Sequence, residues 1–287
     1  SKQGILIFDR TRDNTFQAHY IWVKQGIIRI GAADSPFTNQ ANIILHGAKN
    51  DSYLVVDPDA SGNKMLAVTG DYIYGVQPQT TWTRLTSTAT INSTSINVAS
   101  AAGWSVGNHI VIAPSYAEEN NFNKLLSLLL VEIQLHLHSI NFLAYGDAST
   151  TISNSYGVLD ARSAVGLLTR NIKVTPGPDP NNWGCRILVY GYSELSDNPT
   201  TPPVWRNGYA KLKGVEIDRC GQYDSTYAAI RIENLGVQAD TPNNITTEIE
   251  NTAIHGCGGF CAFIKQVNNV HINNNVFFWA RKFLVYV

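Results

Sequence analysis

The chain has 287 residues, a formal net charge of −1 at pH 7 and only 15% charged residues. A nucleic-acid-binding protein normally carries a basic excess or a basic stripe, and this sequence shows neither, so we expect no nucleic-acid partner. The longest apolar run, residues 125–131, is interrupted by Ser127 and followed by Glu132, so we expect no transmembrane segment in this chain.

The first 80 residues predict a series of short strands. Gly, Asn and Asp residues separate short apolar stretches, and no stretch keeps a helical period for more than two turns. Residues 82–112 continue this pattern, and residues 131–138 alternate apolar and polar side chains, as a strand with one buried face does. The expected strands of the first part are Ile5–Phe8, Tyr20–Val23, Ile27–Ile30, Asn42–Leu45, Leu54–Val56 and Met65–Val68.

The C-terminal part repeats a short unit of strand and polar turn. A period near 22 residues, built from short strands, Asn and Gly, predicts a parallel β-helix in which each coil buries an apolar face against the next. We expect stacked, right-handed coils over residues 160–287, with Ile217 and Ile254 pointing inward at equivalent positions. The echoes are Ile217–Gly221 with Ile254–Gly258, Asn251 and Ile254 with Asn273 and Val276, and Phe263 with Val285.

Several motifs, in chain order, resemble a known family. They are Ile27–Gly31 with Pro36–Phe37, Ile43–Gly47, Gly62–Lys64, Trp82–Leu85, Trp104–Ile112 and Gly166–Ile172. The earliest of them resemble the second half of the eight-glycine domain of fibrocystin-like proteins, and the later ones are similar to the segments that follow it. Asn108 stands where that family usually has Asp, and the early glycines are missing, so we expect the chain to start partway into the domain.

This resemblance implies an extracellular, all-β protein with parallel β-helix repeats. Relatives in the family include ciliary membrane proteins and the cell-migration-inducing, hyaluronan-degrading group. The expected fold class is all-β: a right-handed parallel β-helix, or solenoid, continuous with an N-terminal β-rich partial eight-glycine domain. We expect the partial domain at residues 1–80 and the repeats at residues 81–287.

Four cysteines and three glycosylation sequons point to an oxidising, extracytoplasmic compartment. The Ile-x-x-Cys-Gly echo places Cys220 and Cys257 at equivalent points of successive coils, which predicts a disulfide between them. A Cys257–Cys261 bond, or free buried thiols, are the alternatives. The sequons begin at Asn50, Asn92 and Asn244, all in polar turns, and we expect a glycan on at least one of them.

Glu216 and Asp218 are the weak candidates for catalytic residues. Because they lie two apart in a predicted strand, they share its outer face while Val215 and Ile217 take the inner one. A pair of carboxylates could bind a cation or cleave a polysaccharide. The favoured interpretation is a solvated outer face on which Lys211, Lys213 and Arg219 neutralise the two charges.

The histidines give no complete metal site. His136 and His138 share a predicted strand face, but a third ligand is missing, and His255 and His271 fit surface or turn positions. Because no dinucleotide, phosphate-loop or catalytic-serine motif is present, we expect no cofactor and no metal.

The leading hypothesis is a non-catalytic extracellular or cell-surface module with a structural or adhesive role. The alternatives are a polysaccharide-acting enzyme that uses the outward carboxylates, and a ligand-binding receptor ectodomain fragment. The sequence starts and stops in apolar strand pattern, so we expect copies of the chain, or further chain segments, to cover both ends of the β-helix. Carbohydrate is a further candidate partner.

Overall fold

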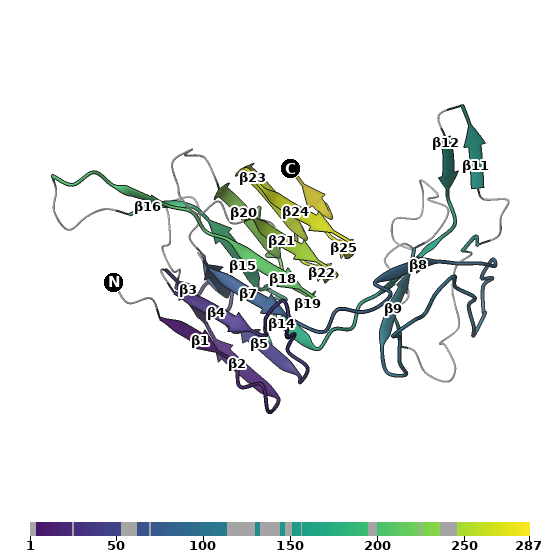
Figure 1. The fold of residues 1–287 in the computed structure, drawn as a ribbon, viewed down its shortest axis with the longest axis horizontal. Helices are drawn as coiled ribbons and strands as arrows, with labels where there is room; N and C mark the ends of the chain where they lie inside the picture. The colour runs from purple at the N-terminus through teal and green to yellow at the C-terminus, as the bar shows by residue number, and fades with distance from the viewer. Residues whose placement is uncertain are drawn as a thin grey trace. The chain divides into compact units, whose positions relative to one another are not determined.

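A computed structural model describes most of the chain (Figure 1). The described residues are 4–24, 26–52, 62–68, 70–113, 130–132, 144–146, 151–155, 157–194, 200–223, 225–235 and 246–287. They contain strands and turns and no helix, so the expected all-β class is confirmed for this part of the chain. The expected strand Leu54–Val56 falls outside the described residues, as do His136 and His138.

Three parallel sheets of six strands form the larger of two compact units (Figure 1). The first sheet has the order β1 (Ile5–Ile7), β4 (Ile27–Ile30), β7 (Asp71–Tyr74), β18 (Ala210–Lys213), β21 (Thr247–Glu250) and β24 (Val270–Asn273). The second has β2 (Asn14–Ala18), β5 (Ala41–Leu45), β14 (Ile172–Pro176), β19 (Val215–Asp218), β22 (Ala253–Cys257) and β25 (Val276–Ala280). The third has β3 (Tyr20–Val23), β6 (Met65–Val68), β15 (Arg186–Tyr190), β20 (Ile230–Leu235), β23 (Ala262–Val267) and β26 (Val285–Tyr286).

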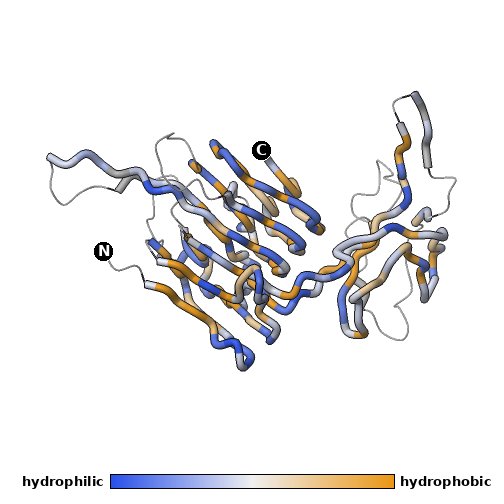
Figure 2. The backbone as a smooth tube through the Cα atoms, viewed as in Figure 1, coloured by the Kyte–Doolittle hydropathy of each residue, from blue (hydrophilic) through white to orange (hydrophobic). Residues whose placement is uncertain are grey.

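The chain visits these three sheets in rotation, one strand in each, before it returns to the first. Every pairing within them is parallel, so each strand lies in register beside one from another turn of the chain. Ile217 pairs with Ile254 and both are fully buried, which confirms the predicted inward positions. Figure 2 shows hydrophobic and hydrophilic positions alternating along the strands, as expected where one face is buried.

The predicted spacing of 22 residues in the last part of the chain is wrong by one residue. Ile254 pairs with Phe277 rather than Val276, and Phe263 pairs with Tyr286 rather than Val285, which is a spacing of 23. The same spacing already holds one strand earlier, where Thr247 pairs with Val270 and Glu250 with Asn273. Asn274, not Asn273, takes the place equivalent to Asn251: both have φ of 52°, and the Asn274 amide donates to the Asn251 side-chain oxygen at 2.6 Å. Asn tolerates this left-handed backbone better than most residues.

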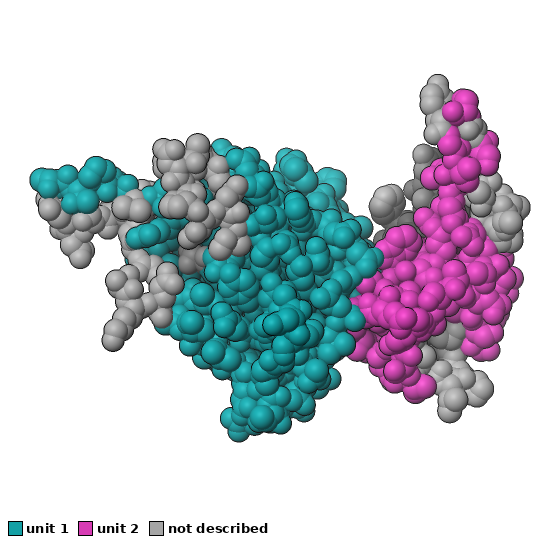
Figure 3. All heavy atoms as spheres, in the orientation of Figure 1, with its two compact units in different colours: residues 1–77, 170–287 teal, residues 78–169 magenta. Residues whose placement is uncertain are grey.

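Residues 78–169 form the second compact unit (Figure 3). Its main sheet is antiparallel throughout and has the order β10 (Leu130–Glu132), β9 (His109–Ile112), β13 (Ala164–Leu167) and β8 (Trp82–Arg84). The unit also contains an antiparallel hairpin of β11 (Thr151–Asn154) and β12 (Gly157–Asp160). A separate small core includes Leu85, Ile112 and Val165.

The compact units therefore differ from a division at residue 80. Residues 1–77 share the large unit with residues 170–287, because β5, β6 and β7 pair with β14, β15 and β18 across the inserted unit. Within residues 160–287, β13 and the ribbon of β16 (Tyr192–Glu194) and β17 (Val204–Arg206) are antiparallel, contrary to the expectation of parallel coils throughout.

One carboxylate interrupts the apolar interior of the large unit. Asp71 begins β7 at a position whose partners in register are Ile28 and Ala210, and it is fully buried. Neither of its carboxylate oxygens has a hydrogen-bond partner among the described residues. Burial raises the pKa of this carboxyl well above its ordinary value, although the nearby Tyr72 N–H acts in the opposite direction.

Replacing Asp71 should stabilise the protein at neutral pH. The unfolded chain loses the Asp71 proton above its ordinary pKa of 3.8, whereas the folded chain keeps it until a much higher pH, so wild-type stability falls across that interval. Asp71→Asn should therefore raise the free energy of unfolding at pH 7, because the amide carries no charge that burial penalises. Denaturant unfolding of both proteins at pH 4 and pH 7 measures this. The gain should be smaller at pH 4, and an equal or negative change at pH 7 would contradict the assignment.

Candidate functional site

The two candidate catalytic carboxylates lie on β19. Val215 and Ile217 are fully buried in the core, and Glu216 and Asp218 lie on the opposite face of the second sheet, as the alternation predicts. The expectation that both are solvated is wrong for Glu216, because only 3% of this residue is exposed.

Three donors surround the Glu216 carboxylate. Lys173 on β14, its partner in register, places Nζ at 3.1 Å, the Arg170 backbone N–H donates at 3.0 Å, and His255 Nε2 lies at 3.3 Å. Burial alone would raise the pKa of Glu216, but the hydrogen bond from His255, the charge of Lys173 and the Arg170 N–H hold it below its usual range. Glu216 is therefore an ionised, fully engaged carboxylate.

His255 on β22 joins the two carboxylates. Its Nδ1 lies 3.4 Å from Asp218 Oδ1, and Asp218 and His255 are partners in register. Asp218 also accepts from Arg219 Nε at 2.8 Å, as predicted. Lys211 and Lys213 are not partners of these carboxylates: both pair with Glu248 on the first sheet, and Lys213 also with Glu250. The reason is that β18 and β21 are direct neighbours in that sheet.

The same cluster fixes the place where the chain re-enters the large unit. Arg170 is the first residue after the inserted unit, and its Nε donates to the Asn251 carbonyl at 2.8 Å while its N–H is held by Glu216. Gln77, the last residue before the inserted unit, accepts from the Asn251 side chain. A general acid or base must reach its substrate, and a buried carboxylate with three donors does not. The geometry thus favours an anchoring role over catalysis.

The cysteines pair differently from the predicted Cys220–Cys257 bond. Cys185 is bonded to Cys220 and Cys257 to Cys261. Cys220 and Cys257 do occupy equivalent points, since the Gly258 N–H donates to the Cys220 carbonyl at 3.0 Å. However, Cys185, directly before β15, has its Cα 4.3 Å from that of Cys220 and is bonded to it. Cys257 is bonded to Cys261, four residues along the chain. The alternative Cys257–Cys261 pairing is the one observed.

The sequons lie in exposed turns where they are described. Asn50 is exposed in a turn after β5, and Asn92 is exposed in a turn with φ of 69°. Asn244 is outside the described residues. Both described asparagines are accessible to a modifying enzyme, and their glycosylation stays a prediction.

The His, Cys, Asp and Glu residues are scattered over the described part of the chain. In the described ranges no three or more of them are placed to hold a metal ion. His271 is exposed on β24, and His255 is engaged by the two carboxylates. Nor does this part of the chain contain a helix long and apolar enough to cross a membrane.

The fold thus defines a class: an all-β protein with three parallel sheets and two disulfides. Comparison with known proteins shows what the chain is similar to. Residues 1–86 match the G8 domain. A stretch of 190 residues is 34% identical to human fibrocystin-L and 30% identical to mouse fibrocystin-L, which is 64% of this chain and 4% of either relative. A G8 domain-containing protein of Dictyostelium discoideum is 27% identical over 179 residues, 60% of this chain and 12% of that protein.

The chain is similar to fibrocystin-like, G8-containing proteins, which confirms the resemblance drawn from its motifs. It spans about 4% of the length of the fibrocystin-L proteins that it matches. Among solved structures, the crystal structure of the tailspike protein gp49 from Pseudomonas phage LKA1 matches 92% of this chain and 35% of its own, at 11% identity and a TM-score of 0.24.

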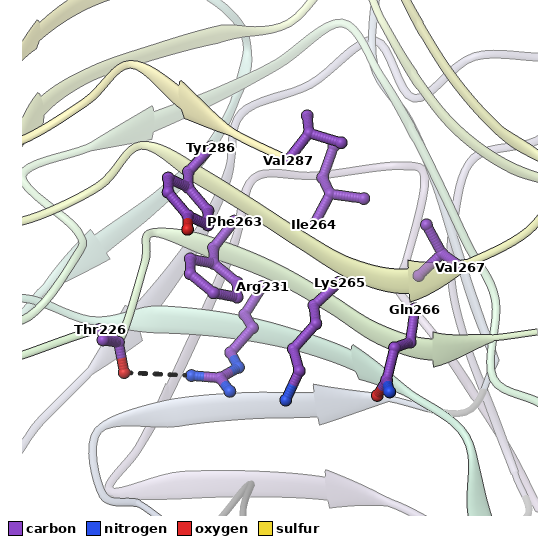
Figure 4. Close-up of a pocket in the computed structure, with 9 residues that line it drawn as sticks. All are labelled: Thr226, Arg231, Phe263, Ile264, Lys265, Gln266, Val267, Tyr286 and Val287. Carbon is purple, nitrogen blue, oxygen red and sulfur yellow. Dashed lines mark hydrogen bonds between the residues drawn. The ribbon is translucent and has the colours of Figure 1, made fainter.

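Sequence reasoning missed two features of the outer walls. Lys173 and Arg170 belong to the Glu216 cluster, and only the pairing of β14 with β19 brings them there. The other is a hollow on the third sheet, beside Arg231 and Phe263, which Figure 4 shows. Arg231 and Phe263 pair in register on neighbouring strands, but they lie 32 positions apart in the sequence, with a segment outside the described ranges between them. No local motif therefore marks this pair.

Removing the Glu216 charge should destabilise the large unit in a pH-dependent way. A carboxyl whose folded pKa is lowered adds stability above its ordinary pKa, 4.5 for Glu, and that stability is lost as pH falls through the lowered value. Glu216→Gln should cost about 1.5–3 kcal/mol at pH 7, the range for hydrogen bonds to a charged group. The difference from wild type should shrink below pH 4.5 in denaturant unfolding.

Glu248→Gln is the matched control. Glu248 is likewise engaged by cations, here Lys211 and Lys213, but it is more exposed than Glu216, so its loss should cost less than about 1 kcal/mol. Equal losses for the two variants at pH 7 would show that the burial of Glu216 has no special importance.

Disulfide mapping should recover the pairings Cys185–Cys220 and Cys257–Cys261. All four cysteines are in disulfides, so alkylation without a reductant should label none of them, even in denaturant. Cys185→Ser with Cys220→Ser should lower the free energy of unfolding by about 2–4 kcal/mol. Non-reducing peptide mass spectrometry checks the pairing, and a Cys220–Cys257 peptide would contradict it.

Proposed function

We propose that the chain is part of an extracellular or cell-surface module with a structural or adhesive role and no catalytic activity. The observation that carries this proposal is the state of the candidate carboxylates. Glu216 is buried under three donors, and Asp218 is held between His255 and Arg219. A polysaccharide-cleaving pair would instead stand open to a substrate, one carboxyl protonated and one ionised.

We further propose that the three parallel sheets belong to one right-handed parallel β-helix. The rotation of the chain through the three sheets supports this, and parallel crossovers are right-handed in nearly all folds. The division into a partial eight-glycine domain at residues 1–80 and repeats at residues 81–287 remains a proposal. It concerns families of sequence, and it does not describe the compact units of the structure.

Further strands are the proposed partners of the two outermost strands of each sheet. β1 and β26 each have a neighbour on one side only, and Ile5, Ile7, Val285 and Tyr286 expose much of their apolar surface there. Such edges pair readily with additional strands, from a second copy of the chain or from further polypeptide.

An extracellular location fits the two disulfides and the exposed Asn50 and Asn92 sequons. The fibrocystin-like relatives support it at the level of the family alone. Carbohydrate attached at these sequons would keep the turns of the module hydrated and would not require any catalytic site.

Secretion of the 287-residue chain from cultured eukaryotic cells tests the proposal. We expect N-glycan on Asn50 or Asn92 by glycopeptide mass spectrometry, and no shortening of hyaluronan by size-exclusion chromatography. Asn50→Gln and Asn92→Gln serve as controls for the glycan assignment. Hyaluronan cleavage that disappears in Glu216→Gln would replace the proposal by the enzyme hypothesis, and an unglycosylated, reduced protein would contradict the extracellular location.

A further inference from the structure

The four cysteines meet at one corner of the large unit, where the chain passes from the second sheet to the third. Cys220 follows β19 by two residues and Cys257 ends β22, both on the second sheet. Cys185 directly precedes β15 and Cys261 directly precedes β23, both on the third. All four are fully buried in the same apolar core cluster, so the two disulfides share one site that is closed to water.

Cys220 lies between Cys185 and Cys257 along the stack of strands. The Gly221 N–H donates to the Cys185 carbonyl at 2.6 Å, and the Gly258 N–H donates to the Cys220 carbonyl at 3.0 Å. Both hydrogen bonds join neighbouring turns of the chain, whose strands lie about 4.8 Å apart. A disulfide spans roughly 4.4–6.8 Å between Cα atoms, so Cys220 has a cysteine within bonding range on each side.

The backbone reaches Cys220 and Cys257 by the same path. β19 and β22 pair in register, and each is interrupted by a left-handed residue immediately before or near its cysteine: Arg219 has φ of 54° and Gly256 has φ of 66°. The two cysteines then follow these residues directly, at equivalent points of successive turns. In the oxidised protein they nevertheless belong to different disulfides.

Cys261 lies on the far side of this series. Its Sγ is 4.0 Å from the Trp279 carbonyl on β25, whereas the Cys220 Sγ is 3.8 Å from the Val174 carbonyl on β14. In the second sheet β14 and β25 lie on opposite sides of the pair β19 and β22. Of the two sulfurs in the Cys257–Cys261 disulfide, Cys257 is therefore the nearer partner for Cys220.

We infer that this corner is a redox switch that moves one cross-link by one turn of the chain. A dithiol reductant opens the Cys257–Cys261 bond, which gives two thiols and the oxidised form of the reductant. The Cys257 thiolate then attacks the Cys220 Sγ, the Cys185–Cys220 bond breaks, and Cys185 leaves as a thiolate that takes up a proton. This second step consumes no electrons, because one disulfide replaces another.

The order of the two steps follows from the lengths of the closed segments. The Cys257–Cys261 bond closes a separation of four residues and the Cys185–Cys220 bond one of 35, so the first restrains the unfolded chain less and adds less stability. After the exchange the turn that carries Cys185 is released, and the next two turns are joined instead. The inference does not depend on the proposed function, because it rests on the four cysteines alone.

Cys261→Ser in the 287-residue chain tests the switch without a reductant, because it leaves Cys257 as a thiol. The variant is held at about pH 8, near the ordinary pKa of a thiol, then quenched with acid and alkylated in denaturant. Peptide mass spectrometry should find a Cys220–Cys257 disulfide with alkylated Cys185 in at least about a tenth of the molecules, since the exchange replaces one disulfide between neighbouring turns by another. The rest should keep Cys185–Cys220.

Cys257→Ser is the matched control, because it leaves Cys261, the sulfur farther from Cys220, as the thiol. This variant should contain Cys185–Cys220 and alkylated Cys261 alone, and thermal melting should show that both variants are folded. A Cys261→Ser protein that holds only Cys185–Cys220, or equal exchange in the Cys257→Ser protein, would overturn the inference.

Brief treatment of the unaltered chain with dithiothreitol, followed by the same quench and mapping, makes the test independent of the serine variants. Molecules that retain one disulfide should include the Cys220–Cys257 form in a similar share. One-disulfide molecules that all keep Cys185–Cys220 would again overturn the inference.

Discussion

In-register pairing of parallel strands is the constraint on which the rest of this structure depends. In the second sheet the row of paired residues runs through Phe16, Ile43, Val174, Ile217, Ile254 and Phe277, so every strand adds an apolar side chain to the same wall of the core. A shift of one residue in any strand would turn its core face outward. Asn251 and Asn274 protect this register, because their matching left-handed corners start β22 and β25 at equivalent points.

The same register assembles charged groups on the outer walls. Lys173 meets Glu216, and Asp218 meets His255, because each pair lies side by side on neighbouring strands. On the first sheet this produces the alternation of Lys211 and Lys213 with Glu248 and Glu250, and on the third it aligns Arg231 with Phe263. The outer walls differ in how much of their surface is buried. Glu216 lies beneath the returning chain at Arg170, whereas Lys265 and Tyr286 face solvent. The wall at Glu216 is thereby suited to anchoring the returning chain.

Asp71 is an acidic residue at a position where the stacking of apolar side chains predicts an apolar one. The position belongs to an inner row with Ile28 and Ala210, yet a carboxyl occupies it without a hydrogen-bond partner in the described chain. The surrounding rows are apolar enough to keep it protonated, which the raised pKa expresses. Burying this acid costs free energy of folding, and the packing of the neighbouring stacked strands offsets that cost.

Local pattern in the sequence determined the short strands, the alternation of inner Val215 and Ile217 with outer Glu216 and Asp218, the Asn corners and the family resemblance. These depend on neighbours within a few residues, or on motifs that a family shares. The disulfide partners, the spacing of 23 residues and the burial of Glu216 were decided only by the tertiary structure. Cys185, Asn274 and Arg170 reach their partners through packing between separate turns of the chain. The antiparallel unit at residues 78–169 also escaped prediction, since its strands have the same local pattern as the parallel ones and differ only in which strand they pair with.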